Sequence, residues 1–279
     1  LVACRVIADV LGHSGSLSTA FASEQVRCLS KQDQAFVKML CFGTFRHIFS
    51  LQHISQKLLA KPIKTKEREI QAALLMGLYQ LLHLTSIPPH AAVSTTVELT
   101  KSLRKPWAKG LLNAVMREAD RQRDQLVDPI NHPLSAQKEL PPWLLEQIQK
   151  QWPDKWASIA SESLKHPPMV LRVNQNKVSR SDYLGLLETS SIAAKPHNTV
   201  GSAIILESPT AVSELPGFDD GFVSIQDAAA QLAADLLDIK AGQRVLDACA
   251  APGGKACHIL EKEPSTFLLA LDREPERLK

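Results

Sequence analysis

The stretch DACAAPGGKA, residues 247–256, constrains the fold more strongly than any other part of the chain. A short apolar run, Arg244-Val245-Leu246, precedes it, and an apolar-periodic segment begins at Cys257. A second apolar run follows at 266–272. This order predicts a buried strand, a loop, a helix and a second strand, which is how a doubly wound nucleotide-binding sheet begins.

The predicted loop lies where an open parallel sheet binds its ligands, beyond the carboxyl ends of the strands. Gly253 and Gly254 allow the backbone to approach a ligand, and the N-terminus of the next helix favours negative groups. Asp247 ends the first strand and Asp272 ends the second. Because an acidic residue placed like Asp272 can accept hydrogen bonds from both ribose hydroxyls, the site suits an adenosine-bearing cofactor.

Three cofactor types compete for this loop, and the residues favour one. A Walker loop needs a hydroxyl after its Gly-Lys pair, but Ala256 follows Lys255, and Cys249 stands where the first glycine belongs. A dinucleotide site needs three spaced glycines, and the loop has one glycine pair. S-adenosylmethionine needs a ribose clamp and no pyrophosphate cradle, so it fits best. The structural alternative is a tight strand-to-helix turn with a solvent-facing Lys255, which the placement of Asp272 disfavours.

Hydrophobic patterning divides the chain into four regions. Residues 1–126 show three- and four-residue apolar spacing, which predicts an all-α bundle. Residues 127–168 are rich in proline and predict a linker with one short helix. Residues 169–223 alternate strand and helix patterns and predict a small α+β domain. Residues 224–279 predict a helix and then the parallel α/β domain, with a further helix starting in its last seven residues.

Capping and breaking residues predict where the helices of the bundle begin and end. Gly12 ends the first helix, and Ser16 or Ser18 caps the next. Residues 31–60 are expected to form one helix that Pro62 ends. The segment that starts at the N-cap candidate Thr65 is apolar almost all round, which predicts a central, buried helix.

Charge is distributed unevenly, although the formal net charge of the 279 residues is only +3. Residues 1–125 hold 17 Lys and Arg against 9 Asp and Glu, and the remainder is mildly acidic. A polyanion is therefore expected to bind mainly at the front of the chain. The basic stretches are 57–68 and 101–109, and on charge alone a solvated helix surface explains them equally well.

Cysteine usage argues against disulfides and against zinc. The five cysteines are odd in number, none forms a C-x-x-C pair, and the nine histidines show no metal spacing. We expect no metal site and a reducing, cytoplasmic location. Cys4, Cys28 and Cys41 are expected in the core. No apolar run reaches 18 residues, so neither a membrane-spanning helix nor a membrane partner is expected.

Motifs along the whole chain resemble one family. LDACAAPGGKACHI resembles motif I of the RNA cytosine-5 methyltransferases, and FVSIQDAAAQLAADLL resembles the segment that precedes it there. LCFGTFRH, LMGLYQLLHLTSIPPHAAVSTTVEL and KGLLNAVMR resemble the NusB-like RNA-binding domain of the bacterial Sun/Fmu branch, and HPPMVLRVN resembles its middle region. The similarity runs in order over essentially all 279 residues.

The resemblance implies a multidomain chain: an all-α NusB-like bundle, a small α+β unit and the start of a Rossmann-like, class I methyltransferase α/β domain. It implies methylation of carbon 5 of a cytosine in 16S rRNA, with S-adenosyl-L-methionine as cofactor and 16S rRNA or a small ribosomal subunit precursor as partner. Ala256 stands where the family usually has Thr, from which we expect a weaker helix cap. The cofactor-binding residues that it implies are Cys249, Ala250, Ala251, Pro252, Gly253, Gly254, Lys255 and Asp272.

The family's chemistry needs two cysteine motifs that this sequence does not contain. The thiolate of a T-C pair adds to carbon 6 of the cytosine and so activates carbon 5, and the cysteine of a P-C pair helps to release the product. Neither pair occurs in the 279 residues, so no catalytic residue is assigned. Two parallel strands with one and a half helices leave a doubly wound sheet partly uncovered. We therefore expect a truncated methyltransferase domain with an open apolar edge, and an inactive, monomeric chain.

Two other functions remain open at this stage. The NusB-like bundle would bind rRNA without chemistry through its basic stretches, with an affinity that weakens steeply with salt. A general small-molecule or protein methyltransferase would explain the loop but not the basic bundle ahead of it.

Overall fold

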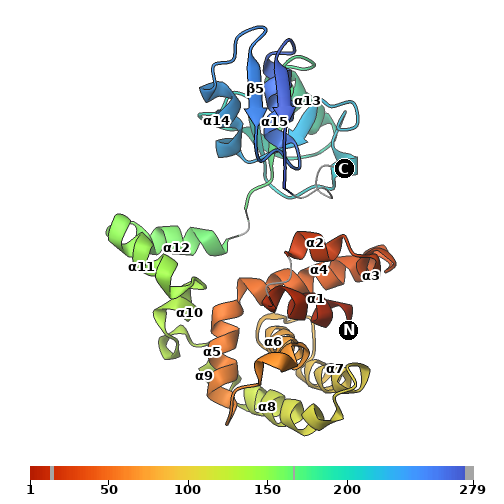
Figure 1. The fold of residues 1–279 in the computed structure, drawn as a ribbon, viewed down its shortest axis with the longest axis vertical. Coiled ribbons are helices and arrows are strands. Elements are labelled where there is room, and N and C mark those ends of the chain that lie inside the picture. Colours follow the sequence, from red (N-terminus) through yellow and green to blue (C-terminus); the bar gives the residue numbers. More distant parts are fainter. Residues whose placement is uncertain (13–15, 166, 274–279) are drawn as a thin grey trace. The chain divides into compact units, whose positions relative to one another are not determined.

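The computed structural model describes residues 1–12, 16–165 and 167–273, and it consists of two compact units (Figure 1). The first unit spans Leu1–Lys165 and the second spans His166–Lys279. The helix expected to start at 273–279 lies outside the described residues, apart from Arg273. Among the described residues, no helix is long and apolar enough to cross a membrane.

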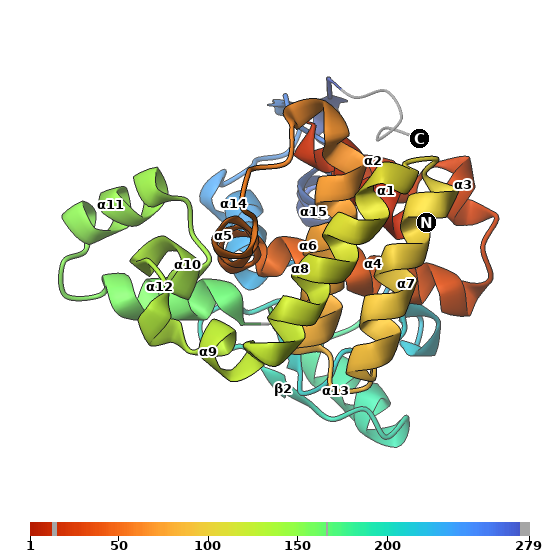
Figure 2. The same cartoon turned by 90° about the horizontal axis from the view of Figure 1, so that it is seen from below.

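The first unit is helical throughout, with short 3-10 turns between some of the helices (Figure 2). The bundle predicted for residues 1–126 is confirmed. The helices of the unit are α1 (Val2–Leu11), α2 (Leu17–Phe21), α3 (Glu24–Arg27), α4 (Lys31–Arg46), α5 (Ile48–Leu58), α6 (Arg68–His83), α7 (Pro89–Ser102), α8 (Lys109–Arg121), α9 (Arg123–Val127), α10 (Leu134–Lys138), α11 (Pro142–Gln151) and α12 (Trp156–Leu164).

The linker with one short helix predicted for residues 127–168 is wrong, because α10, α11 and α12 form there. Pro133 and Pro141 are helix N-caps rather than parts of an extended linker, and the side chains of this stretch form a small core of their own with Leu145, Ile148 and Ala160.

Helix α6 is the centre of the bundle, as its apolar sequence predicts. It packs against α1, α4, α5, α7 and α8, which surround it in Figure 2. Twelve consecutive or near-consecutive residues are therefore buried, and glycine at position 77 lets Thr96 of α7 approach its backbone closely. The buried residues are Ile70, Ala72, Ala73, Leu74, Leu75, Met76, Gly77, Leu78, Tyr79, Gln80, Leu81 and Leu82.

The single helix expected over residues 31–60 is wrong, because the chain breaks at His47 into α4 and α5. A carboxylate from far along the chain caps the new helix. The Glu139 Oε2 atom accepts hydrogen bonds from the amides of Phe49, at 2.9 Å, and Ser50, at 3.3 Å. An acidic group at a helix N-terminus satisfies amides that have no acceptor within the helix. Since Glu139 lies 90 residues from Phe49, the local apolar spacing contains no sign of this break.

Two smaller expectations for the bundle also need correction. Thr65 does not cap α6; it begins a 3-10 turn, Thr65–Glu67, and the α-helix begins at Arg68. Cys4 and Cys41 are buried as expected, but Cys28 is exposed because α3 is a single short turn with only Val26 in the core. The N-cap expected at Ser16 is confirmed, since its side chain accepts a hydrogen bond from the Thr19 amide.

A four-stranded antiparallel sheet opens the second unit. Its order is β2-β3-β1-β4, and in its register Leu171 stands opposite both Ile204 and Ile225. Helix α13 packs on one face, where it buries Tyr183 and Leu187. The expected α+β pattern is confirmed, but the short edge strand β2 was not predicted. The bounds are β1 (Val170–Val173), α13 (Arg180–Thr189), β2 (Ala194–Pro196), β3 (Ala203–Leu206) and β4 (Val223–Ile225).

A second sheet of two parallel strands follows, as the sequence predicts. It consists of β5 (Arg244–Asp247) and β6 (Phe267–Ala270), with α14 (Ala228–Leu236) before it and α15 (Gly254–Lys262) between the strands.

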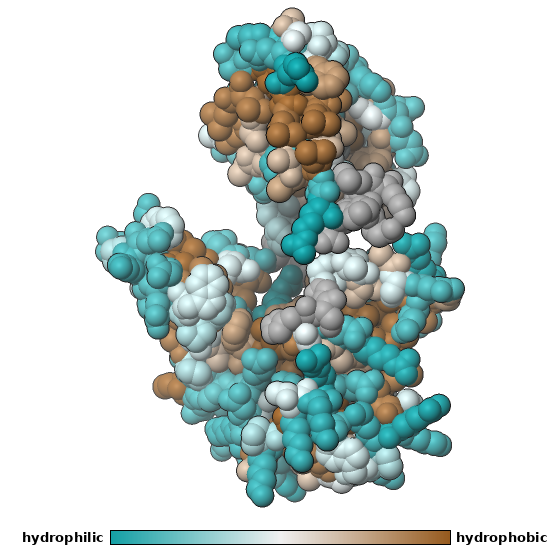
Figure 3. Space-filling model, in the orientation of Figure 1, coloured by the Kyte–Doolittle hydropathy of each residue, from teal (hydrophilic) through white to brown (hydrophobic). Residues whose placement is uncertain are grey.

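The expectation that β5 is buried is wrong, because the described residues supply no further strand or helix to cover this pair. Leu246 is 59% exposed, and Phe267 is exposed to the same extent. The open apolar edge expected from the sequence is therefore present, and Figure 3 shows apolar side chains gathered on one face of this unit. The exposed large apolar residues from 232 onward are Leu232, Leu236, Leu237, Leu246, Leu260, Phe267, Leu269 and Leu271.

We predict that Leu78→Ala lowers the free energy of unfolding of the first unit by about 2–5 kcal/mol, because it leaves a cavity at a fully buried position of α6. Urea unfolding followed by circular dichroism at 222 nm measures the change. The control is Val127→Ala, at a position 44% exposed, where we expect a change within about 0.5 kcal/mol. Equal effects of the two variants would contradict the central place of α6.

Candidate functional site

The loop predicted to hold a cofactor lies at the carboxyl ends of β5 and β6. It leaves β5 after Asp247 and enters α15 at Gly254. Two backbone hydrogen bonds extend the strand pairing into the loop: the Leu271 amide donates to the Asp247 carbonyl at 2.8 Å, and the Ala250 amide donates to the Leu271 carbonyl at 2.9 Å. The start of the loop is therefore held against the end of β6.

Both acidic residues at the strand ends bond to the backbone of this loop. The Oδ1 atom of Asp247 accepts a hydrogen bond from the Cys249 amide at 3.2 Å. The Oδ2 atom of Asp272 accepts one from the Ala251 amide at 3.0 Å. A carboxylate has about four acceptor positions on its two oxygens, so a carboxylate that orders the loop retains the capacity to accept from a ligand as well.

Gly253 gives the loop a backbone shape that other residues disfavour. Its φ is +97°, and it is the N-cap of α15. The first amides of an α-helix have no acceptor within the helix, and a glycine N-cap supplies no side chain to satisfy them. The turn therefore presents backbone donors and the positive end of a helix dipole at the carboxyl edge of the sheet.

The structure brings all the predicted site residues together. Ala250 is buried at 6% exposure, which leaves its backbone rather than its side chain to shape the loop. Cys249, Pro252 and Lys255 are exposed, and Ala251, Gly253, Gly254 and Asp272 are half-buried. Cys257, where the apolar-periodic segment of the sequence begins, is exposed.

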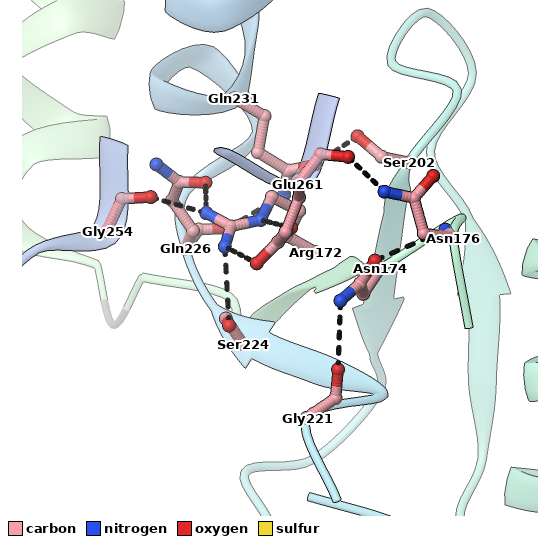
Figure 4. A network of polar contacts seen from close by, with 10 residues as sticks. All are labelled: Arg172, Asn174, Asn176, Ser202, Gly221, Ser224, Gln226, Gln231, Gly254 and Glu261. Atoms are coloured by element: carbon pink, nitrogen blue, oxygen red, sulfur yellow. Dashed lines mark hydrogen bonds and ion pairs between the residues drawn. The ribbon is translucent and has the colours of Figure 1, made fainter. Parts of the chain in front are cut away.

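Sequence reasoning missed Arg172, whose fully buried guanidinium lies beside the site (Figure 4). It comes from β1, in the four-stranded sheet, and it forms a two-pronged ion pair with Glu261 of α15. The Nε–Oε2 distance is 3.0 Å and the Nη2–Oε1 distance is 2.7 Å. A bidentate pair of this kind fixes orientation as well as distance. The available sequence signal was an arginine inside the otherwise apolar strand VLRV.

The same guanidinium also reaches the loop. Its Nη1 atom donates to the carbonyl oxygen of Gly254 and to Oε1 of Gln226, each at 2.6 Å. Gln231, in turn, donates from Nε2 to the Gln226 carbonyl at 3.0 Å and accepts at Oε1 from Ser202 Oγ at 2.7 Å. The two glutamines of the QDAAAQ segment therefore belong to one polar network with Arg172 and the loop, as Figure 4 shows.

His258 borders this network from α15 and is only 5% exposed. Burial, followed by the positive charge of Arg172, lowers the pKa of its imidazole below the usual value, against a smaller opposing effect of Glu261. The ring is therefore neutral at pH 7. Its Nδ1 atom has no hydrogen-bond partner among the described residues.

Comparison with known families gives one match in each of three parts of the chain. Residues 1–121 match the NusB family, residues 140–213 match a ferredoxin-like domain of RsmF/B-like methyltransferases, and residues 234–279 match the 16S rRNA methyltransferases RsmB/F. The last two matches thus place the chain among the relatives of the rRNA methyltransferases.

Individual relatives give the narrower family. The Ribosomal RNA small subunit methyltransferase B of Serratia proteamaculans is 44% identical over 100% of this chain, and that of Pseudomonas syringae pv. tomato is 43% identical over 100%. The chain spans 64% and 62% of the lengths of these two relatives. The chain belongs to the ribosomal RNA small subunit methyltransferase B family.

A solved structure supports the fold. The crystal structure of PH0851 superimposes with a TM-score of 0.73 over 99% of this chain and 64% of that one, at 19% sequence identity. At this identity the similarity concerns the fold alone.

We predict that Gly253→Ala lowers the free energy of unfolding of the second unit by about 1–2 kcal/mol, because an L-residue is strained at a φ of +97°. The added methyl group meets nothing closer than the Cys257 Sγ atom at 3.8 Å, so the loss isolates backbone strain. Gly185→Ala is the matched control. It lies within α13 with nothing within 4 Å, and there alanine should stabilise by about 0.5–1 kcal/mol. Urea unfolding of each variant compares the two, and changes of the same sign would contradict the prediction.

Proposed function

We propose that this chain supplies the RNA-binding and cofactor-binding segments of an enzyme that methylates carbon 5 of a cytosine in 16S rRNA, with S-adenosyl-L-methionine as methyl donor. The observation that carries this proposal is the loop at 249–255, closed by the hydrogen bond between Ala251 and Asp272 at the carboxyl edge of a parallel strand pair. The family to which the chain belongs supports the rRNA substrate.

The residues of the loop fit this cofactor in three ways. Asp272 places a carboxylate at the end of β6, where it would accept hydrogen bonds from the ribose hydroxyls. Gly253 and Gly254 let the backbone approach the ligand, and the helix N-terminus would bind the carboxylate of the amino-acid part. When bound, the cofactor supplies an activated methyl group. The protein residues named here bind and orient it.

We assign no residue of this chain to the bond-forming step. Methylation at carbon 5 requires a cysteine thiolate as nucleophile, and the T-C and P-C pairs of the family are absent from the 279 residues. Burial raises the pKa values of the Cys4 and Cys41 thiols to about 12, so both are protonated at neutral pH and belong to the core. We propose that this polypeptide by itself binds cofactor and RNA without transferring the methyl group.

A second candidate function, RNA binding without chemistry, is favoured by one feature of the bundle. Lys105 forms ion pairs with Glu67 and Glu69, which brings the basic stretches 57–68 and 101–109 to one surface. Trp107 is 56% exposed beside them and offers an aromatic face for stacking on an unpaired base. The exposed basic residues are Lys57, Lys61, Lys64, Lys66, Arg68, Lys101, Arg104 and Lys109.

We predict that Asp272→Asn weakens the binding of S-adenosylhomocysteine to the chain at least tenfold. The side-chain carbonyl of Asn can still accept from the Ala251 amide, but the substitution removes the charge and one of the two acceptor oxygens. Isothermal titration calorimetry measures the affinity, with NAD and ATP as ligands that should not bind. Asp219→Asn, an exposed carboxylate of the same unit, should stay within about twofold of the parent chain. Absence of binding by the parent chain, or tighter binding of NAD, would refute the proposed cofactor.

We predict that Lys64→Gln combined with Lys101→Gln reduces the salt dependence of binding to a 16S rRNA fragment. Each lost phosphate contact lowers the slope of log K against log salt by about 1. Filter binding at several salt concentrations gives the slope. The control Lys195→Gln removes an exposed lysine of the second unit and should leave the slope unchanged. Equal slopes in all three proteins would place the RNA on another surface.

A further inference from the structure

One buried side chain connects the four-stranded sheet to the cofactor loop. Arg172 belongs to β1, and it contacts α15 at two points, the carbonyl of Gly254 and the carboxylate of Glu261. These points lie seven residues apart, about 10 Å along the helix axis. A rigid group that holds a helix at its first residue and two turns later determines both its position along the axis and its rotation about it.

The chemistry of these contacts is specific for a guanidinium. Arg172 donates to Glu261, Gln226, Gly254 and, at 3.4 Å, to Ser224 Oγ. Its planar fork has five donors in a fixed arrangement, whereas a lysine ammonium is a compact charge with three donors on a flexible stem. A lysine at this position would retain the charge but would be unable to hold both ends of the contact.

The contact at Gly254 matters most for function, because this residue is both the first of α15 and part of the glycine pair of the loop. A shift of the helix would move the amides that the helix N-terminus presents to a ligand, together with Gly253 and its positive φ. The orientation of the cofactor loop thus depends on the four-stranded sheet as well as on β5 and β6.

We propose that Arg172 is a positioning residue for the cofactor loop: by bonding Gly254 and Glu261 from β1, it holds the start of α15 in the orientation that binds the cofactor. The predicted effect of Arg172 on cofactor binding rests on the proposed function. Its predicted effect on the orientation of the loop does not. The four-stranded sheet then contributes to the cofactor site through Arg172.

The test compares Arg172→Lys with the parent 279-residue chain by hydrogen–deuterium exchange and by calorimetric titration with S-adenosylhomocysteine, well below the unfolding midpoint. We expect the amides of residues 254–258 to exchange at least tenfold faster, those of β1 and β3 to change less than threefold, and the affinity to fall at least tenfold. Glu261→Gln, which removes the ion pair but keeps the side-chain size, should act in the same direction. The affinity of the double variant should fall by less than the product of the two single fold-losses, because both substitutions remove the same interaction.

Tyr183→Phe serves as the matched structural control. It removes a buried hydrogen bond, from the Tyr183 hydroxyl to the Pro216 carbonyl at 3.0 Å, in the same unit and away from α15. We expect it to lower the unfolding midpoint without changing exchange at 254–258 or the affinity. If Arg172→Lys speeds exchange uniformly over the unit, as a merely structural residue would, or leaves residues 254–258 unchanged, the inference is overturned. If the parent chain does not bind S-adenosylhomocysteine, the proposed function fails, and the exchange data alone decide whether Arg172 orients the loop.

Discussion

The arrangement of the second unit depends on the contacts that the buried guanidinium of Arg172 makes. A guanidinium with no exposed side-chain surface must have its charge and its donors satisfied within the protein. Glu261 neutralises it, and Gln226, Ser224 and the Gly254 carbonyl accept its remaining hydrogen bonds. Such a network is costly when one member is missing, so the antiparallel sheet and the start of α15 are tied to a single mutual geometry.

That geometry explains how an incompletely covered strand pair still presents an ordered loop. β5 and β6 expose Leu246 and Phe267 to solvent, and hydrophobic burial on that side contributes little. Three polar contacts order the loop instead: Asp247 accepts from the Cys249 amide, Asp272 accepts from the Ala251 amide, and Arg172 donates to the Gly254 carbonyl. The cofactor site proposed here therefore depends on hydrogen bonds more than on packing.

The sequence was sufficient for features whose causes are local. The apolar sequence of α6 predicted its central, buried place. The apolar runs before and after the glycine-containing loop predicted the two parallel strands. Features that depend on distant residues were not predictable. The break at His47 depends on a cap from Glu139, 90 residues away from Phe49, and the Arg172–Glu261 pair spans 89 residues. The exposure of β5 likewise reflects which elements lie beside it. The assignment of the eight loop and strand-end residues to the cofactor stays a prediction.

The most direct test of the central claim is to map S-adenosylhomocysteine onto the chain by two-dimensional NMR of the ¹⁵N-labelled protein. The proposed site predicts amide shift changes concentrated at residues 249–255 and beside Asp272, with smaller changes along α15 toward Glu261, and none in the helical bundle. Shift changes elsewhere, or none at saturating ligand, would contradict the claim that this loop is the cofactor site.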